Sequence, residues 1–312
     1  MVLQITDNHI YAEAEASNKG YAPAASLAAV LAAAARRRPR PQALLFTGDV
    51  SNDDTEGSYA RFVAAVQRAW PHLRQHRGAA AAAAAAAGGE GAQTAVLFTP
   101  GNHLVANYAA MREAFGAAGW QGPSVDDEDR ILSVQLCEGW RCVLLDSTVP
   151  ASQSNEAGKA VHGEIDAAQV MALRGELALA EVEGERVLVV MHHPMRAPTT
   201  EAESVWSRVC LRGEVAALLQ RAVADSPAVA AVLTGHLHSE MDERVGNARL
   251  LAAPSTCHQY LQEGERIRLA EDDTSGFREI VLKSDGRWTT EVVRLGAAAD
   301  AAARVSTPPA TA

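Results

Sequence analysis

The sequence predicts an α/β fold, because short apolar strands alternate with segments of helical periodicity along most of the chain. Residues 2–6 form the first predicted strand. Leu27, Val30, Leu31 and Ala34 then recur at i, i+3, i+4 and i+7, which is the spacing of one helix face. With 312 residues, the chain is long enough to bury a sizeable core as one large domain or two small ones.

The alternation continues toward the C-terminus. A second helical stripe consists of Tyr59, Phe62, Val63, Val66 and Trp70. Asp166 is a predicted helix cap, because Gln169 follows three residues later as in a capping box. Residues 277–282 and 288–295 flank Ser284-Asp285-Gly286, which is a hairpin signal. The other predicted strands are residues 43–47, 95–99, 131–136, 142–145, 187–191, 229–234 and 250–253.

Residues 78–91 interrupt this pattern with a low-complexity stretch of alanine flanked by glycine. Alanine favours helix, but the flanking glycines favour a surface insertion without a role in function. We therefore expect one domain over residues 1–295, with 78–91 inserted into it. The Ala/Thr/Pro-rich residues 296–312 are expected to form a disordered tail.

The charge of the chain argues against a nucleic-acid partner, because its formal net charge is −10. One basic cluster, Arg36, Arg37, Arg38 and Arg40, follows the first predicted helix, where cations are favoured by the helix dipole. An acidic protein that hydrolyses an anion needs a local positive charge, which bound metal could supply.

The cysteines and the hydropathy suggest a reduced, aqueous compartment. Cys137 and Cys142 lie in apolar strand-like runs and are expected to be buried thiols, and no CxxC pair occurs. No apolar run reaches transmembrane length, and Met1 leads directly into the first strand. We expect a cytoplasmic protein that does not bind membranes; the sequence carries no signal for its oligomeric state.

Potential metal ligands follow the predicted strands five times. Because ligands in α/β sheets gather outside the carboxyl ends of strands, one site can collect all five segments. Each segment alone is open to a structural explanation, such as an ordinary turn, and the argument rests on the repetition. The segments are Asp7-x-His9, Gly48-Asp49, Gly101-Asn102-His103, His192-His193-Pro194 and Gly235-His236-Leu237-His238.

The types of ligand favour a pair of divalent cations. Carboxylate, amide oxygen and imidazole suit Mn, Fe, Zn and similar ions, and no thiolate belongs to the set. Two such ions can clamp a phosphoryl group and activate water, so that no Ser or Cys nucleophile is needed. The sequence contains neither a Gly-x-Ser-x-Gly elbow nor a P-loop.

The ordered set of segments resembles the signature of the calcineurin-like metallophosphoesterases. The resemblance implies a four-layer α-β-β-α sandwich with two mixed sheets and two divalent metal ions, Fe, Mn or similar. It also implies that Asp49 bridges the metals and that His103 is the catalytic residue, binding phosphate and assisting the leaving group. The implied ligands are Asp7, His9 and His238 for one metal, and Asn102, His192 and His236 for the other. Asn102, His103 and His238 are expected to contact the substrate, and His193 is expected to be adjacent only.

Further segments resemble the bacterial class III 3′,5′-cyclic AMP phosphodiesterases over residues 1–295. They are residues 3–7, 144–147, 162–164, 253–257 and 276–278. This likeness implies hydrolysis of cyclic AMP to 5′-AMP by a metal-bridging hydroxide, with the purine held by stacking or apolar contact near residues 235–238 and 253–257. One departure is Leu104, where the family has an Asp after Gly-Asn-His.

Two alternatives remain beside cyclic AMP hydrolysis. One is a phosphoesterase for another phosphodiester, a nucleotide or a lipid-linked pyrophosphate, since fold and metals do not fix the substrate. The other is a binding scaffold without hydrolysis, which normally requires lost ligands, whereas all seven implied ligands are present.

Overall fold

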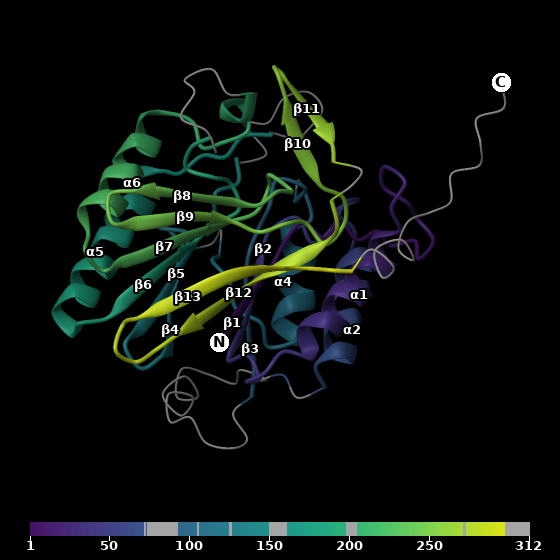
Figure 1. Ribbon diagram of the computed structural model, residues 1–312, viewed down its shortest axis with the longest axis horizontal. Coiled ribbons are helices and arrows are strands. Elements are labelled where there is room, and N and C mark those ends of the chain that lie inside the picture. Colours follow the sequence, from purple (N-terminus) through teal and green to yellow (C-terminus); the bar gives the residue numbers. More distant parts are fainter. Residues whose placement is uncertain are drawn as a thin grey trace.

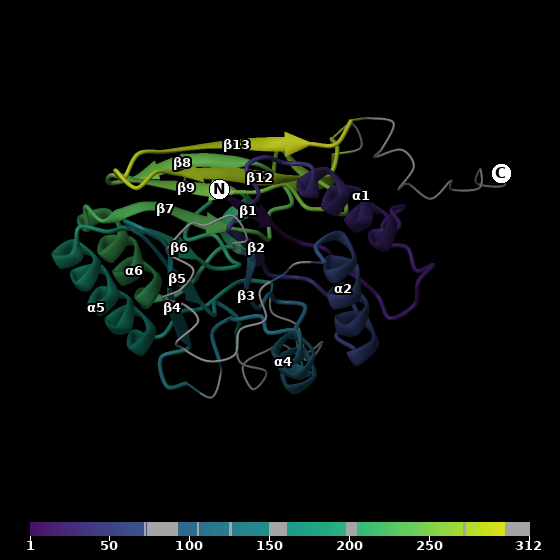
Figure 2. The ribbon, with the colours of Figure 1, turned by 90° about the horizontal axis from the view of Figure 1, so that it is seen from below.

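Two β-sheets packed face to face form the centre of the molecule, and helices cover the outer face of each sheet (Figures 1 and 2). The computed structural model describes residues 1–71, 73, 93–104, 106–124, 127–149, 161–197, 205–270 and 273–296. The expected insertion, 78–91, and nearly all of the expected tail lie outside these residues. No helix in the described part is long and apolar enough to cross a membrane.

The first sheet has the strand order β13-β12-β1-β2-β3. Its parallel strands are β1 (Val2–Ile5), β2 (Ala43–Thr47) and β3 (Ala95–Thr99). Strand β12 (Gly276–Leu282) pairs antiparallel with β1, and β13 (Trp288–Arg294) completes the predicted hairpin. The helices on this side are α1 (Pro23–Ala35), α2 (Glu56–Ala69) and α4 (Tyr108–Ala117).

The second sheet has the order β4-β5-β6-β7-β9-β8. Strands β5 (Trp140–Leu145), β6 (Arg186–Val190), β7 (Val229–Thr234) and β9 (Ala248–Ala252) are parallel. The edge strands β4 (Ile131–Cys137) and β8 (Met241–Val245) are antiparallel to their neighbours. Helices α5 (Ala167–Glu183) and α6 (Glu214–Asp225) cover its outer face (Figure 2).

A separate hairpin stands beyond both sheets. It consists of β10 (Tyr260–Glu263) and β11 (Arg266–Leu269), and it contacts the short 3-10 helix η2 (Val205–Arg208) (Figure 1).

Alternate side chains of each strand enter different cores, which explains the four layers. On β2, Leu44 and Phe46 pack toward the helices, while Leu45 packs between the sheets. On β5, Val143 packs under α5 and α6, while Leu144 faces the other sheet. Because both faces of central strands such as β2 and β7 are buried, these strands are apolar along nearly their whole length. The predicted α-β-β-α sandwich with two mixed sheets is confirmed.

The element predictions hold closely where hydrophobic periodicity is strong. Every strand predicted from the sequence is present, with ends that differ by at most two residues. Asp166 and Gln169 form the reciprocal capping box that begins α5. The periodicity analysis did not identify α4, α6, β8 or the β10–β11 hairpin. The hairpin alternates between half-buried and exposed residues, which leaves little apolar signal.

Arg37 belongs to the fold rather than to a free basic patch. Its guanidinium pairs with Glu279 on β12 at 2.6 Å and with Glu291 on β13 at 2.8 Å. The cation just after α1 therefore fastens the helix to the antiparallel edge of the first sheet.

Two buried polar side chains tie the sheets together. Gln4 on β1 donates from Nε2 to the Thr234 carbonyl at the end of β7, at 2.8 Å. Arg278 on β12 donates to the carbonyls of Met241 and Ala252 in the other sheet, at 3.2 and 2.8 Å. Burial lowers the pKa of Arg278 to about 10, so the side chain stays charged at neutral pH. These contacts fix how the strand ends of one sheet meet those of the other.

Replacing Arg278 should destabilise the fold. In Arg278→Leu the two carbonyls lose their donors, and each unpaired buried acceptor costs about 1–3 kcal/mol. We expect the free energy of unfolding, measured by chemical denaturation, to fall by about 2–5 kcal/mol. The exposed Arg287, in the turn before β13, gives the control Arg287→Leu, which should leave the midpoint unchanged. Equal midpoints for both variants would contradict this role of Arg278.

Candidate metal centre

The five predicted segments meet at one place in the structure. Strands β1, β2 and β3 of the first sheet and β6 and β7 of the second all end there, and the loops after them carry the polar side chains. Asp7, His9, Asp49, Asn102, His192 and His238 are all buried. The sequence prediction that one site collects these residues agrees with the geometry.

The first group contains Asp7, His9 and His238, whose ligand atoms lie within 4.8 Å of one another. The Nε2 atoms of His9 and His238 are 2.9 Å apart, and His238 Nε2 lies 3.4 Å from Asp7 Oδ1. Two imidazole nitrogens and a carboxylate oxygen thus point at a common centre.

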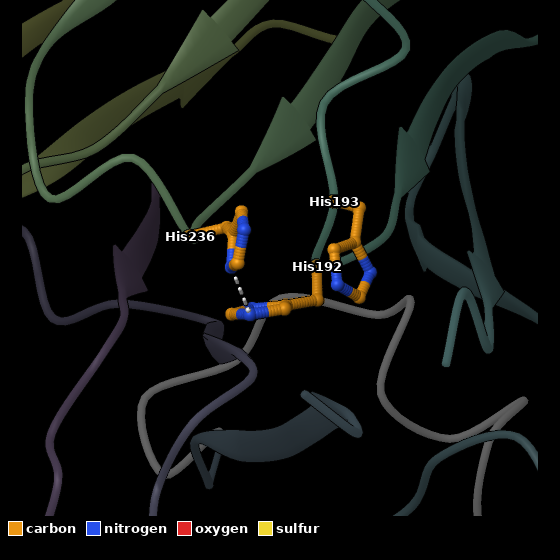
Figure 3. A group of neighbouring side chains, drawn as sticks. All are labelled: His192, His193 and His236. Carbon is orange, nitrogen blue, oxygen red and sulfur yellow. Dashed lines mark hydrogen bonds between the residues drawn. The ribbon is translucent and has the colours of Figure 1, made fainter. Parts of the chain in front are cut away.

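The second group is centred on His192. Its Nε2 atom lies 3.2 Å from Asn102 Oδ1 and 3.1 Å from His236 Nδ1. The His192–His236 contact is the dashed line in Figure 3. The members of this group come from β3, β6 and β7, so that both sheets contribute to it.

Asp49 lies between the two groups. Its Oδ2 atom is 3.5 Å from His192 Nε2, and its carboxylate also clusters with His9 and His103. Asp49 Oδ1 accepts a hydrogen bond of 2.9 Å from the His103 backbone N–H. A carboxylate in this position can contact two cations at once.

Backbone carbonyls orient two of the imidazoles. His192 Nδ1 lies 2.8 Å from the Thr47 carbonyl, and His238 Nδ1 lies 2.9 Å from the His258 carbonyl. A carbonyl accepts only, so each Nδ1 carries a proton and each Nε2 is the nitrogen that faces the centre. This arrangement is typical of histidines that bind metal.

The pKa values of the cluster favour cation binding. Burial, with the charges of His103 and His238, holds the pKa of His9 well below its usual value, and burial beside His192 lowers that of His236 to about 3. Burial acts to raise the pKa of Asp49, but His103 and His192 outweigh it and hold that pKa well below its usual range. Neutral imidazoles beside ionised carboxylates are the metal-binding forms. His192 is the exception: burial acts to lower its pKa, but Asp49 outweighs burial and raises that pKa to about 9, so His192 must release a proton when it binds a cation.

The backbone at this site is strained. Asp7, His9, Asp49, His236 and His238 all have positive φ, between 47° and 70°. In the described part of the chain only three other non-glycine residues share this conformation. Such conformations cost of order 1–3 kcal/mol each and concentrate at functional sites. The strain turns each side chain inward directly after its strand, a feature that sequence patterns do not reveal.

Glycine is required beside the ligands by lack of space. A Cβ atom on Gly101 would lie 2.3 Å from both the backbone nitrogen and Oδ1 of Asp49. A Cβ atom on Gly48, where φ is +96°, would lie 2.2 Å from His192 Nδ1. These glycines are therefore part of the site rather than ordinary loop residues.

The donor set fits two divalent cations. The buried carboxylates, the amide oxygen and the imidazoles provide hard and borderline ligands in two adjoining groups. His9 also retains a buried Nδ1 atom without a hydrogen-bond partner in the described structure. A buried polar nitrogen of this kind costs free energy unless it gains a hydrogen-bond partner.

His103 stands at the edge of the two groups. Its Nε2 atom is 3.8 Å from Asp49 Oδ2, and its Nδ1 atom is 3.3 Å from the Asn52 carbonyl. Leu104, at the position of the family's Asp, packs half-buried against the core under α1, α2 and α4. In this chain the Asn52 carbonyl and the Asp49 carboxylate therefore orient the His103 ring.

His193 lies beside His192 and His236, and the ligand atoms of the three histidines are within 4.8 Å of one another (Figure 3). Its Nδ1 atom is 2.9 Å from Ser147 Oγ, which also accepts a hydrogen bond from the His193 backbone N–H at 3.1 Å. Gly163 approaches the ring so closely that a Cβ there would lie 2.4 Å from His193 Cγ. Two segments that the sequence analysis singled out, 144–147 and 162–164, therefore support the side chain of this histidine.

Residues 253–257 support the first loop in the same way. Ser255 Oγ donates to the Asp7 carbonyl at 2.7 Å, and Thr256 Oγ1 accepts from Asn8 Nδ2 at 3.0 Å. Both hydroxyls are fully buried. This segment therefore holds the backbone that carries Asp7 and His9.

A pocket of about 570 Å³ opens over the metal groups. Its wall includes His9, Asp49, Asn102, His103, His236 and His238, together with residues that the sequence analysis did not select. Among these, His258 follows the apolar strand β9 by a few residues, the same signal that marked the other segments. Lys19 and Tyr260 gave no such signal, since one lies in a turn and the other begins an exposed hairpin.

Comparison with known proteins identifies relatives of this chain. Residues 1–240 match the family model of the calcineurin-like phosphoesterases. The 3′,5′-cyclic adenosine monophosphate phosphodiesterase CpdA of Pseudomonas aeruginosa is 31% identical over 297 residues, which are 95% of this chain and 90% of that protein. The 3′,5′-cyclic-nucleotide phosphodiesterase alr5338 of Nostoc sp. strain PCC 7120 is 27% identical over 305 residues, 94% of this chain and 92% of that protein.

Solved structures share the fold at low sequence identity. A dimetal phosphatase from Danio rerio superposes with a TM-score of 0.58 at 14% identity, covering 86% of this chain and 94% of that one. GAP50, described as the anchor in the inner membrane complex of Plasmodium, superposes with a TM-score of 0.54 at 12% identity, covering 98% and 86% of the two chains. At these identities the likeness establishes the architecture alone.

Substituting Gly101 should weaken metal binding. In Gly101→Ala the new methyl group displaces Asp49, and residues that position metal ligands typically contribute roughly 10–100-fold in metal affinity. We expect a loss of that size in a titration with Mn²⁺ followed by calorimetry. The control is Gly175→Ala, in the exposed face of α5 with open space around it, which should bind metal like the parent. A Gly101→Ala protein with unchanged affinity would show that the close approach does not matter.

Proposed function

The chain belongs to the calcineurin-like phosphoesterase family, which makes it a hydrolase, and we propose that it hydrolyses 3′,5′-cyclic AMP to 5′-AMP with two divalent metal ions. The observation that carries this proposal is the pair of adjoining ligand groups with Asp49 between them, at the floor of a pocket much larger than a phosphate. We propose that residues 1–295 form this catalytic domain.

The proposed ligand roles follow the geometry. Asp7, His9 and His238 would hold one ion, and Asn102, His192 and His236 would hold the other, with Asp49 placed to serve both. When bound, two such ions neutralise the phosphate charge and lower the pKa of a coordinated water, which supplies the nucleophile at neutral pH. We propose Fe or Mn for these ions, which oxygen and imidazole ligands suit.

His103 acts on the leaving oxygen in this proposal. Its side chain lines the pocket and is 17% exposed, unlike the fully buried His192. The imidazole hydrogen-bonds the phosphate and delivers a proton to the 3′ oxygen as the P–O bond breaks. Asn102 and His238 also line the pocket, so they contact the same phosphate.

The substrate is assigned through the relatives and the pocket together. CpdA proteins of Pseudomonas aeruginosa and Escherichia coli, named as cyclic AMP phosphodiesterases, are similar over 95% and 94% of this chain. The pocket extends well beyond the phosphate position and thus has room for a nucleoside.

A second candidate is a phosphodiesterase with a broader range of substrates. The relative from Nostoc is named for cyclic nucleotides in general, and solved structures with this fold include a phosphatase and a sulfate thiohydrolase. We expect the protein to contact the purine through only a few atoms. The difference in binding free energy between cyclic AMP and cyclic GMP should therefore be modest, within about 1–2 kcal/mol. A scaffold without hydrolysis is disfavoured, because all seven proposed ligands are present and converge.

Substitutions of Asp49 and of His103 should impair metal binding and turnover in different ways. Asp49→Ala removes the carboxylate between the two groups, so both bound metal and turnover should disappear. His103→Ala should keep its metals but lose roughly 10²–10⁴-fold in kcat, the usual contribution of a general acid. Elemental analysis and kcat measured on the same preparations separate the two roles. Full activity in wild-type protein that contains no divalent metal would refute the role of Asp49, and an unchanged kcat in His103→Ala would refute that of His103.

The substrate assignment is tested by comparing diesters on the metal-loaded enzyme. With Mn or Fe supplied, kcat/KM for 3′,5′-cyclic AMP should exceed the values for 2′,3′-cyclic AMP and for bis(p-nitrophenyl) phosphate. Some turnover of the linear diester is expected, because dinuclear sites tolerate varied leaving groups. If linear diesters are cleaved well while cyclic AMP stays intact, the broader phosphodiesterase is the correct reading.

A further inference from the structure

The pocket has an outer wall that the metal chemistry does not use. Besides the metal groups, it is lined by side chains from the loop before α1, from η2 and from the β10–β11 hairpin. These outer residues include Lys19, Val209, Trp206, His258, Tyr260 and Ile267. A phosphate held at the metals leaves this outer wall to the rest of the substrate.

The polar part of the wall is a chain of three side chains. The Lys19 ammonium donates to the Tyr260 hydroxyl and lies 4.6 Å from the centre of that ring. The same hydroxyl is 3.1 Å from His258 Nε2, and the Tyr260 ring lies tilted against the ring of His238, with 4.9 Å between the ring centres. Tyr260 therefore links the exposed lysine to the edge of the metal site.

A tight turn fixes the backbone that carries the Lys19 side chain. Asn18 and Tyr21 exchange backbone hydrogen bonds of 2.8 and 3.0 Å, which close a tight turn with Lys19 at φ +53°. Among the described residues that line the pocket, Lys19 is the only lysine or arginine. Its ammonium has three N–H donors, and Tyr260 takes one of them.

The apolar part of the wall comes from η2 and β11. Trp206, Val209 and Ile267 line the pocket, and η2 and β11 contact each other. Ile267 is half-buried, although it lies in a hairpin whose neighbouring residues are exposed. These side chains form a surface suited to the flat face of an aromatic ring, which stacks and packs without strict geometry.

We infer that this outer wall is a nucleobase site, in which the base packs on Ile267, Val209 and Trp206 while Lys19 donates a hydrogen bond to a ring acceptor of the base. A purine combines the two properties that the wall matches, since it has an apolar face and ring-nitrogen acceptors at its edge. The inference rests on the proposed function, because it takes the substrate to be a nucleotide. It moves the expected purine contacts away from residues 253–257 toward the hairpin and adds Lys19 as a specificity-determining residue.

Binding of three ligands to the metal-loaded protein tests the inference without any turnover. The ligands are 5′-AMP, ribose 5-phosphate and inorganic phosphate, and Kd is measured by titration calorimetry. The wild-type protein should bind 5′-AMP at least about tenfold more tightly than ribose 5-phosphate, a factor that corresponds to about 1.4 kcal/mol. Equal affinities for these two ligands would overturn the inference.

Substitutions then test whether Lys19 and Ile267 belong to the nucleobase site. Lys19→Met and Ile267→Ala should each weaken 5′-AMP by roughly tenfold, and the ratio of the affinities for 5′-AMP and phosphate should fall accordingly. The matched control is Lys283→Met, which removes an exposed lysine outside the pocket and should change neither affinity. If Lys19→Met weakens 5′-AMP and inorganic phosphate by the same factor, Lys19 serves the phosphate and the inference is wrong.

Kinetic measurements distinguish a failure of this inference from a failure of the proposed function. With cyclic AMP as substrate, Lys19→Met should raise KM more than it lowers kcat, whereas His103→Ala should lower kcat. If the wild-type enzyme leaves cyclic AMP intact, the proposed substrate fails, while the calorimetric comparison of 5′-AMP with ribose 5-phosphate still decides whether the wall binds a base.

Discussion

The structure depends on one constraint: the carboxyl ends of strands from two different sheets must meet at a single point. There, Asp7, Asp49 and their histidine neighbours are buried together, and such groups are costly to bury without a compensating charge. The two sheets are held in register near this point by Gln4, whose side chain crosses from β1 to β7. The positive φ values and the glycines beside Asp49 follow from the same constraint, because the chain must turn inward immediately after each strand.

The sequence was most informative where chemistry and periodicity coincide. Residues 2–6, 43–47 and 95–99 are apolar runs that end in a polar ligand, so strand and site were identified by the same signal. The order of the segments carried the family resemblance, and the resemblance supplied the partition of ligands between two ions. In the structure Asp49 lies beside His192, which contacts Asn102 and His236, while the partition itself stays a prediction.

Other features were beyond sequence reasoning for physical reasons. Lys19 approaches Tyr260, more than two hundred positions later in the chain, because a loop and a hairpin happen to border one pocket. No periodicity encodes such a contact. The hairpin alternates between half-buried and exposed residues, and its apolar signal was too weak to predict a strand. Residues such as Ser147 and Ser255 were visible only as parts of motifs, and their hydrogen bonds to His193 and Asp7 required coordinates.

The place of β1 in the first sheet also bears on how the protein is made. This strand lies between β2 and β12, and its loop carries Asp7 and His9, whose partner His238 is separated from them by most of the chain. During synthesis the N-terminus emerges first, yet one edge of β1 stays unpaired until residues 276–282 have left the ribosome. Strands far apart in the sequence must therefore both be made before this sheet closes, and the group of Asp7, His9 and His238 is incomplete until His238 has emerged.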